Sequence, residues 1–225
     1  MEFASADPSA IRSIKQRMLL QSWMRALREE KLLPLIGDFQ PDGLANELAD
    51  MMAFDLDEDD GTARFLITQE GWRMAAAYGS VPIDPVLGRT KRYLDDVVEP
   101  DRYARLLPCY LACLTQKRPV YSISRVVDTD GKDVSYERLL LPFGRDDEVE
   151  QIIGSYKAIS VRDGSAVTNL GALGKSYSSV RVVSAVIDGP SSSRASNRRA
   201  ETMIVPESRG DLTSPASLPW HRYPA

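Results

Sequence analysis

Residues 117–143 form the stretch KRPVYSISRVVDTDGKDVSYERLLLPF, in which two runs rich in β-branched and aromatic residues flank a polar segment. Such runs are typical of β-strands, and the Asp130-Gly131 pair between them is a strong signal for a hairpin turn. A third run of the same kind, EQIIGSYKAISV, occupies residues 150–161. Because strands joined by short turns must be antiparallel, we expect a three-stranded meander here, with pairing that stops near Pro142.

Helices are predicted on the N-terminal side of the meander. Apolar side chains recur at helical spacing in residues 99–118, EPDRYARLLPCYLACLTQKR. An interior proline costs about 3 kcal/mol or more, so we expect a kink at Pro108 or a second helix that starts there. Further helices are expected at residues 9–31, 42–50, 70–79 and 89–97.

Two further strands are predicted at residues 51–57 and 62–69, on either side of an acidic stretch. That stretch, DLDEDDG at residues 55–61, begins as a calcium loop does. An EF-hand loop requires glycine at its sixth position and glutamate at its twelfth, whereas this stretch has Asp60 and Leu66 there. We therefore interpret it as a hairpin turn and predict no metal site.

The order of elements, helices and two strands followed by helices and three strands, is typical of an α+β domain. Beyond Gly164 serine, glycine, proline and arginine dominate, and such a composition predicts disorder. One segment, SVRVVSAVID at residues 179–188, alternates and is β-branched, so it could pair with a sheet edge. The predicted parts are an N-terminal helical segment at residues 1–34, a domain at residues 35–163 and a disordered tail at residues 164–225.

This order, together with the pieces RFLITQEG, AAAYG, VLGRT and the meander, resembles the PAS domain. More specifically, the chain is similar to small stand-alone bacterial PAS proteins with a leading helical segment, here SWMRALREEKLLP. The resemblance extends from Ile11 to Val161, and one difference is the long link between Gly79 and Gly88. It implies a five-stranded antiparallel sheet with helices covering one face, and strands in the order second-first-fifth-fourth-third. It also implies a sensory or interaction module.

In that strand order the first-to-second and fourth-to-fifth turns share one rim of the sheet. Acidic side chains of the two turns would then lie about 10 Å apart, across two strand spacings. We interpret this charge as solvation of the rim, and the alternative is a surface for a basic partner or a weakly held cation. The residues concerned are Asp57, Glu58, Asp59, Asp60, Asp146, Asp147 and Glu148.

Charge and composition narrow the classes of function. The chain has 225 residues and a net charge of −4, with the acidic excess before Gly164, which disfavours nucleic-acid binding. There is no apolar run of about 18 residues and no secretory signal, so we expect no membrane span and a cytoplasmic location. The only histidine, His221, lies in the predicted tail, and no phosphate-binding loop is found. We therefore predict no catalytic residues and no enzymatic activity.

The sequence does not identify a cofactor, which stays unknown. Histidine is the usual ligand of haem, and without one in the domain Cys109 or Cys113 is the remaining alternative. Neither cysteine has the Asn-Cys-Arg context of the flavin-binding light sensors. The two lie four residues apart on one face of a predicted helix, and we interpret them as buried, reduced thiols.

Polar and aromatic residues suggest where a ligand would bind. Arg125 and Glu137 on the meander either lie on the covered face, paired or facing a polar ligand, or form a salt bridge on the solvated face. The aromatic candidates would line a cavity or simply pack in the core. The pocket candidates are Trp72, Tyr78, Tyr110, Cys113, Tyr121, Arg125 and Glu137.

The N-terminal helix has an apolar stripe that includes Ile14, Met18, Trp23 and Leu27. This stripe either packs on the chain's own sheet or pairs with a second copy, and we favour a homodimer. The prediction for the whole chain is a non-enzymatic bacterial PAS-type module of signal transduction that binds a small ligand or a signalling protein. The alternative is a ligand-free interaction adaptor with a filled core.

Overall fold

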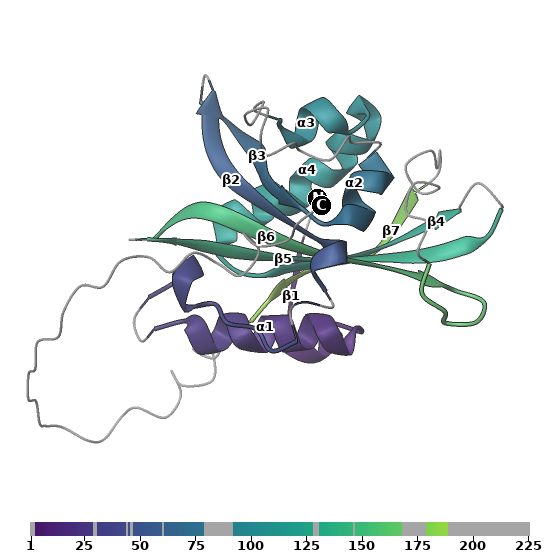
Figure 1. Cartoon of the computed structure of the whole chain (residues 1–225), viewed down its shortest axis with the longest axis horizontal. Helices are drawn as coiled ribbons and strands as arrows, with labels where there is room; N and C mark the ends of the chain where they lie inside the picture. The colour runs from purple at the N-terminus through teal and green to yellow at the C-terminus, as the bar shows by residue number, and fades with distance from the viewer. Residues whose placement is uncertain are drawn as a thin grey trace, which may run out of the picture.

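The computed structural model describes residues 3–28, 31–43, 45, 47–59, 61–78, 92–127, 131–145, 147–167 and 179–188. They form one open β-sheet with helices on both sides (Figure 1). The strands are β1 (Ala4–Ala6), β2 (Met51–Asp59), β3 (Thr62–Glu70), β4 (Val120–Val127), β5 (Asp133–Arg145), β6 (Glu148–Ser160) and β7 (Ser179–Ile187). The helices are α1 (Ile14–Ala26), α2 (Trp72–Tyr78), α3 (Leu94–Val97) and α4 (Pro100–Gln116), with 3₁₀ turns at Pro8–Ala10, Ile36–Asp38 and Leu48–Asp50.

The sheet contains seven strands in the order β1-β7-β4-β5-β6-β2-β3. Strands β4, β5, β6, β2 and β3 are antiparallel neighbours in the predicted order, so this part of the prediction is confirmed. The sheet is nevertheless larger and mixed, because β7 pairs antiparallel with β4 and β1 pairs in parallel with β7. The prediction of five strands, all antiparallel, is wrong in these two respects.

Strand β7 lies within the segment that composition predicts to be a disordered tail. It pairs with β4, as the alternation of this one segment suggested, and Ala185 and Ile187 are buried on the sheet. The folded domain therefore does not end at residue 163, and Asp188 still donates its backbone N–H to the Ala6 carbonyl at 2.8 Å. Residues 189–225 lie outside the described residues, so their predicted disorder stays a prediction.

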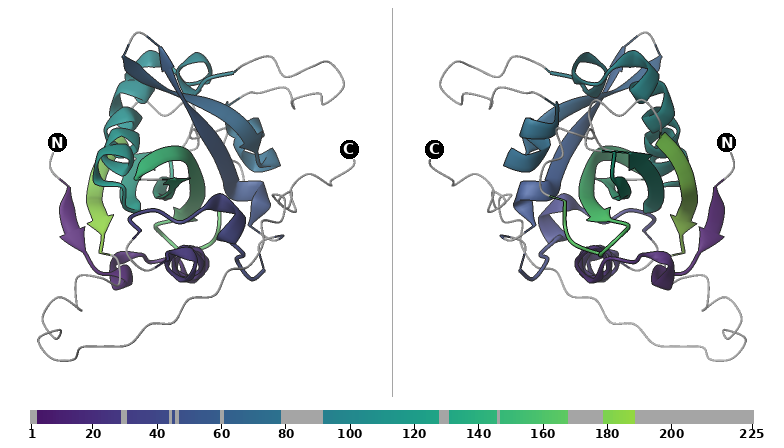
Figure 2. Two further views of the ribbon diagram at one scale, coloured as in Figure 1. Left: turned by 90° about the vertical axis from the view of Figure 1, so that its left-hand side faces the viewer. Right: turned by 90° about the vertical axis from the view of Figure 1, so that its right-hand side faces the viewer.

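Helices cover both faces of the sheet (Figures 1 and 2). We call the buried cluster between the sheet and α4 the α4 layer, and the cluster between the sheet and α1 the α1 layer. The prediction that helices cover one face only is wrong. Strand β5 has apolar side chains on both faces, and covering one face would leave half of them exposed to water. Buried residues of the α4 layer include Phe54, Phe65, Tyr110, Tyr136, Leu140 and Tyr156, and those of the α1 layer include Leu20, Trp23, Phe39, Tyr121, Leu139 and Phe143.

Helix α4 runs from Pro100 to Gln116 as one helix that contains Pro108. Pro108 therefore does not start a second helix, contrary to that alternative of the prediction. A proline removes the donor for the carbonyl four residues earlier, which belongs to Ala104. Ala104 is exposed, so water can hydrogen-bond this carbonyl instead.

Strand β5 continues past Pro142, contrary to the prediction that pairing stops there. Pro142 lies opposite Ile152 of β6, and this ladder continues to the end of the strand. On its other side β5 pairs with β4 as far as Leu140, opposite Val120, and no described strand pairs with it beyond that point. A residue without an N–H is tolerated on this open edge, and the Pro142 carbonyl there accepts a hydrogen bond from Trp23 Nε1 at 2.7 Å.

The acidic stretch forms the predicted hairpin between β2 and β3. Asp59 pairs with Thr62, and Gly61 has a φ of 75°, as a two-residue hairpin turn requires. The β2–β6 ladder ends at Asp55 opposite Gln151, and Figure 1 shows the β2–β3 hairpin turning away from the end of β5 and β6 beyond that point. The proximity of the acidic turns stays a prediction, because Asp60 and Asp146 are outside the described residues.

The N-terminal helices are shorter than predicted. Helix α1 begins after Ser13, whose hydroxyl accepts a hydrogen bond from the Gln16 backbone N–H at 3.4 Å. The residues before it form a separate 3₁₀ turn at Pro8–Ala10. Within the predicted helix at residues 42–50, Gly43 has a φ of 67°, which a right-handed helix excludes. The described residues of this range contain 3₁₀ turns, among them Leu48–Asp50, and no α-helix.

Candidate functional site

Arg138 lies near the middle of β5 with its side chain in the α4 layer. Alternation along the strand places it on the same face as Tyr136 and Leu140. Its cross-strand partners are Ser122 on β4 and Tyr156 on β6. Arg138 is 3% exposed and Ser122 is 2% exposed, so the fold places a guanidinium group beneath α4.

Two tyrosine rings flank this guanidinium group. Its central carbon lies 5.7 Å from the centroid of the Tyr136 ring and 5.9 Å from that of the Tyr156 ring. The two rings are themselves 6.2 Å apart and inclined by 27°. These distances are within the range of cation–π attraction, which strengthens where water is excluded.

A glycine allows Tyr156 to reach across the sheet toward α4. A Cβ atom on Gly154 would lie 2.4 Å from the Tyr156 hydroxyl, so only glycine leaves room for this ring position. The Tyr156 hydroxyl shares a 2.8 Å hydrogen bond with that of Tyr110 on α4. Tyr110 in turn makes aromatic contacts with Phe54 and Phe65 at ring-centroid distances of 5.4 and 4.9 Å. The polar groups are thus enclosed by aromatic residues.

The charge of Arg138 has no acidic partner among the residues that the structure describes. None of them forms a hydrogen bond or ion pair with Arg138, and its Nε atom is buried without a hydrogen-bond partner. Burial by itself disfavours the charge, but the surrounding groups of Cys109 and Tyr110 raise the pKa of Arg138 overall. An arginine stays protonated in any case, so within the described part of the chain this buried cation is uncompensated.

A second group of charged residues at the sheet is paired, in contrast to Arg138. Lys157 on β6 contacts Glu47 at 2.5 Å and Asp50 at 3.1 Å. The same two carboxylates also contact Lys15 at 2.6 Å and Arg73 at 3.0 Å. Each carboxylate of this network has cationic partners within the chain and needs no ligand for pairing.

Helix α4 contributes two thiols to the layer, Cys109 and Cys113, which are both buried and free. Burial raises the pKa of Cys113 well above its ordinary value, and the neighbouring Cys109 raises it further. The thiol therefore stays protonated at neutral pH and is a poor nucleophile. The prediction of buried, reduced cysteines is confirmed.

Three of the predicted pocket residues lie on the opposite face of the sheet. Tyr121 and Glu137 are buried in the α1 layer, where the Tyr121 hydroxyl donates to Glu137 Oε2 at 2.9 Å and accepts from the Arg12 backbone N–H at 3.2 Å. Burial raises the pKa of Tyr121. Arg125 is exposed and makes no salt bridge with Glu137, so neither predicted arrangement of that pair occurs.

The remaining pocket candidates are divided. Tyr110 and Cys113 lie in the α4 layer with Arg138. Trp72, at the start of α2, is 67% exposed and lies 5.0 Å from the guanidinium carbon of Arg73, measured from its ring centroid. The side chain of Tyr78 is outside the described residues.

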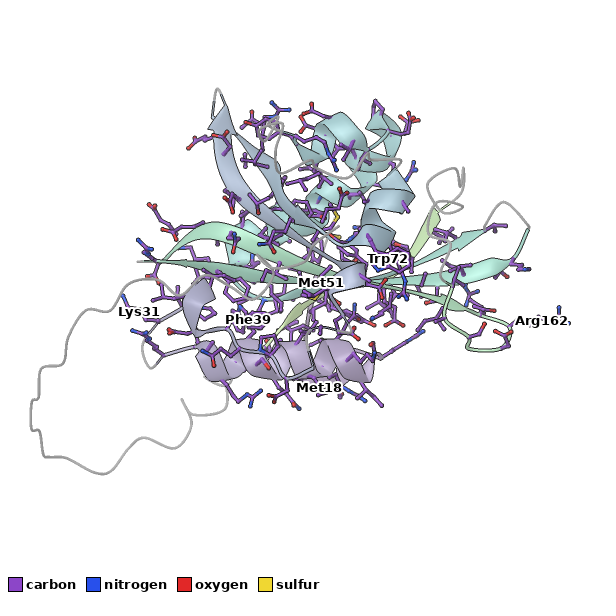
Figure 3. The ribbon with its side chains drawn as sticks, viewed as in Figure 1. Met18, Lys31, Phe39, Met51, Trp72 and Arg162 are labelled. Carbon is purple, nitrogen blue, oxygen red and sulfur yellow. The ribbon has the colours of Figure 1, made fainter. Side chains whose placement is uncertain are left out.

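The predicted interface residues of α1 are also divided. Trp23 is 1% exposed and Leu27 packs against the α1 layer, so both contact the chain's own sheet. Ile14 and Met18 are 67% and 44% exposed, and Figure 3 shows Met18 on the side of α1 that faces away from the sheet. Packing on the chain's own sheet therefore occurs, and two apolar side chains one helical turn apart stay accessible.

Sequence reasoning missed Arg138 and Tyr156, which form the centre of the site. The available signal was an arginine next to the apolar run at residues 139–143, with Tyr136 two residues before it and Tyr156 opposite it on the neighbouring strand. Alternation alone could not show which face was which, because both faces of β5 are covered.

Comparison of the chain with protein-family models, with curated proteins and with solved structures finds no match. In the described part of the chain there is no helix with the length and apolarity needed to cross a membrane. The same residues contain no cluster of three or more side chains of the metal-ligating types. The function must therefore be argued from the site itself.

Proposed function

We propose that this chain is a PAS-type sensory or regulatory module without catalytic activity, which binds a small ligand between the sheet and α4. The strand order β3-β2-β6-β5-β4, with α2, α3 and α4 between its second and third strands in sequence, supports the PAS assignment. A shared fold does not determine function, so the argument for a ligand has to come from the α4 layer.

The observation that carries the proposal is the buried Arg138 without an acidic partner among the described residues. Burying a lone charge costs several kcal/mol of folding free energy relative to an apolar residue of similar size. This is about the free energy lost when a whole core side chain is removed. Stability alone would therefore favour leucine or methionine at this position. Binding of an anionic molecule would explain the presence of an arginine here, whereas core packing does not.

The position of Arg138 also supports transmission of a binding signal. Its neighbours Glu137 and Leu139 point into the α1 layer, so a movement of β5 reaches both faces of the sheet. Helix α1 lies on that second layer and presents exposed apolar side chains to a partner. Ligand binding under α4 would then alter the surface offered by α1, on a protein that we expect in the bacterial cytoplasm.

The test is native mass spectrometry of the full chain purified from its own source without denaturation, followed by analysis of released compounds. We expect one small molecule per chain, and we expect it to raise the unfolding temperature when added back. A spectrum containing only the bare chain, with no compound of a metabolite panel raising the unfolding temperature, would refute the ligand-binding function.

A ligand-free adaptor is the second candidate, and the exposed Ile14 and Met18, one helical turn apart on α1, favour it. Large apolar side chains at the surface mark contact sites for other proteins when they are grouped. An adaptor with a filled core would show the same unfolding temperature with every compound. Substituting Met18 by glutamate would then weaken partner binding, whereas substituting Arg138 would not.

A further inference from the structure

We infer that the ligand is a monocarboxylate with an apolar body, whose carboxylate binds Arg138 next to the rings of Tyr136 and Tyr156. This inference rests on the proposed function and specifies the ligand class of the same site. It follows from the charge of the layer, from the shape of the guanidinium group and from the residues around it.

The charge of the layer favours a ligand with one negative charge. Arg138 is the only buried cation among the described residues. Where the structure describes the chain, the buried acids are Glu47 and Asp50, which pair with Lys157, and Glu137, which lies in the α1 layer. The Glu70 carboxylate is also buried and pairs with Arg92 at 2.6 Å. The described residues thus leave one positive charge of the α4 layer uncompensated, and a dianion such as a phosphate monoester would leave one negative charge buried and unpaired.

The guanidinium group favours a planar anion. Arginine presents its N–H donors in a fixed fork that matches the two oxygens of a carboxylate, and such bidentate pairs are stronger than hydrogen bonds between neutral groups. The Nε atom of Arg138, which forms one edge of this fork, is buried and has no hydrogen-bond partner. A carboxylate would supply the missing acceptor.

The surroundings favour an apolar body on the ligand. The α4 layer consists of apolar and aromatic side chains such as Met74, Leu106 and Phe65, and both tyrosine rings near Arg138 turn toward its guanidinium group. A polar body would lose its hydration there without finding hydrogen bonds, which is costly. An aryl group or a short alkyl chain makes no hydrogen bonds with water, so it would lose none on entering the layer.

The experiment measures thermal unfolding of the full chain with benzoate and hexanoate, beside their neutral amides and inorganic phosphate. We expect both carboxylates to raise the unfolding temperature, whereas benzamide, hexanamide and phosphate do not. Arg138→Met should weaken carboxylate binding at least tenfold, which is the loss expected for a charge-assisted hydrogen bond. Arg125→Met removes an exposed arginine of the adjacent strand and should bind as the wild type does.

The outcomes separate this inference from the proposed function. If the amides stabilise the chain as well as the acids, or if Arg138→Met binds the acids normally, the carboxylate inference fails and a ligand site still stands. If no probe acts and the natively purified chain carries no compound, both fail. Should Arg138→Met not fold, Arg138→Lys keeps the charge but loses the fork, and wild-type affinity in that variant would also contradict the inference.

Discussion

At the scale of single residues, two neighbours on β5 have opposite environments. Glu137 faces the α1 layer and accepts a hydrogen bond from Tyr121, whereas Arg138 faces the α4 layer without an acid among the described residues. The sequence predicts that adjacent strand residues face opposite sides. It does not predict which side each takes when both sides are apolar, which is why Glu137 and not Arg138 stood among the candidates.

The first prediction concerns the cost of this buried charge. In protein refolded from denaturant, and therefore free of ligand, Arg138→Met should raise the free energy of unfolding by about 1 kcal/mol or more, since it removes an unpaired buried cation. Arg125→Met should stay within about 0.5 kcal/mol of the wild type because Arg125 is exposed. Denaturant unfolding measures both. A loss of several kcal/mol in refolded Arg138→Met would mean that the charge is compensated within the chain.

The second prediction concerns Tyr121 and pH. Tyr121→Phe leaves the buried Glu137 without its donor and should cost about 1–3 kcal/mol at neutral pH. Burial raises the pKa of Tyr121, so the phenol ionises in the unfolded chain at about pH 10 while the folded chain keeps it neutral. The stability that Tyr121 contributes is therefore complete below about pH 10 and falls above it.

The corresponding measurement is denaturant unfolding of the wild type and Tyr121→Phe at pH 7 and at about pH 11. The difference in the free energy of unfolding between the two proteins should shrink at the higher pH. A constant difference across this range would show that Tyr121 does not titrate differently in the folded and unfolded chains.

At the scale of elements, the strands and α4 were predictable because each has its own periodicity. The effects of Pro108 and Pro142 were not predictable. Pro108 is tolerated because the Ala104 residue is exposed, and Pro142 because β4 does not extend beside it. Strand β1 has three residues, too few to show a pattern. For β7 the sequence indicated a strand but not the edge of the sheet that it joins.

The third prediction tests the place of β7 in the sheet. Ile187 is 0% exposed, and Ile187→Ala should lower the free energy of unfolding by about 2–5 kcal/mol. Val180, on the same strand, is 63% exposed, so Val180→Ala is the matched control and should have little effect. Equal effects of the two substitutions would mean that β7 is not packed on the α1 layer.

At the scale of the whole molecule, the fourth prediction concerns self-association. Ile14 and Met18 are exposed on α1, and we propose that they contact a second copy. Sedimentation should show a dimer for the wild type and a monomer for the double variant Ile14→Glu/Met18→Glu, with unchanged unfolding temperature. Trp23→Ala instead should cost about 3–5 kcal/mol, because Trp23 is buried in the chain's own core. A monomeric wild type would contradict the dimer.

The molecule is a sheet with two covered faces, and one of them contains a buried charge with no acidic partner among the described residues. The most direct test of the ligand site is native mass spectrometry of the natively purified wild type beside Arg138→Met, with Arg125→Met as the control. We predict that the wild type and the control each carry one anionic compound and that Arg138→Met carries none. The same compound on all three proteins, or a bare chain in every case, would contradict the account.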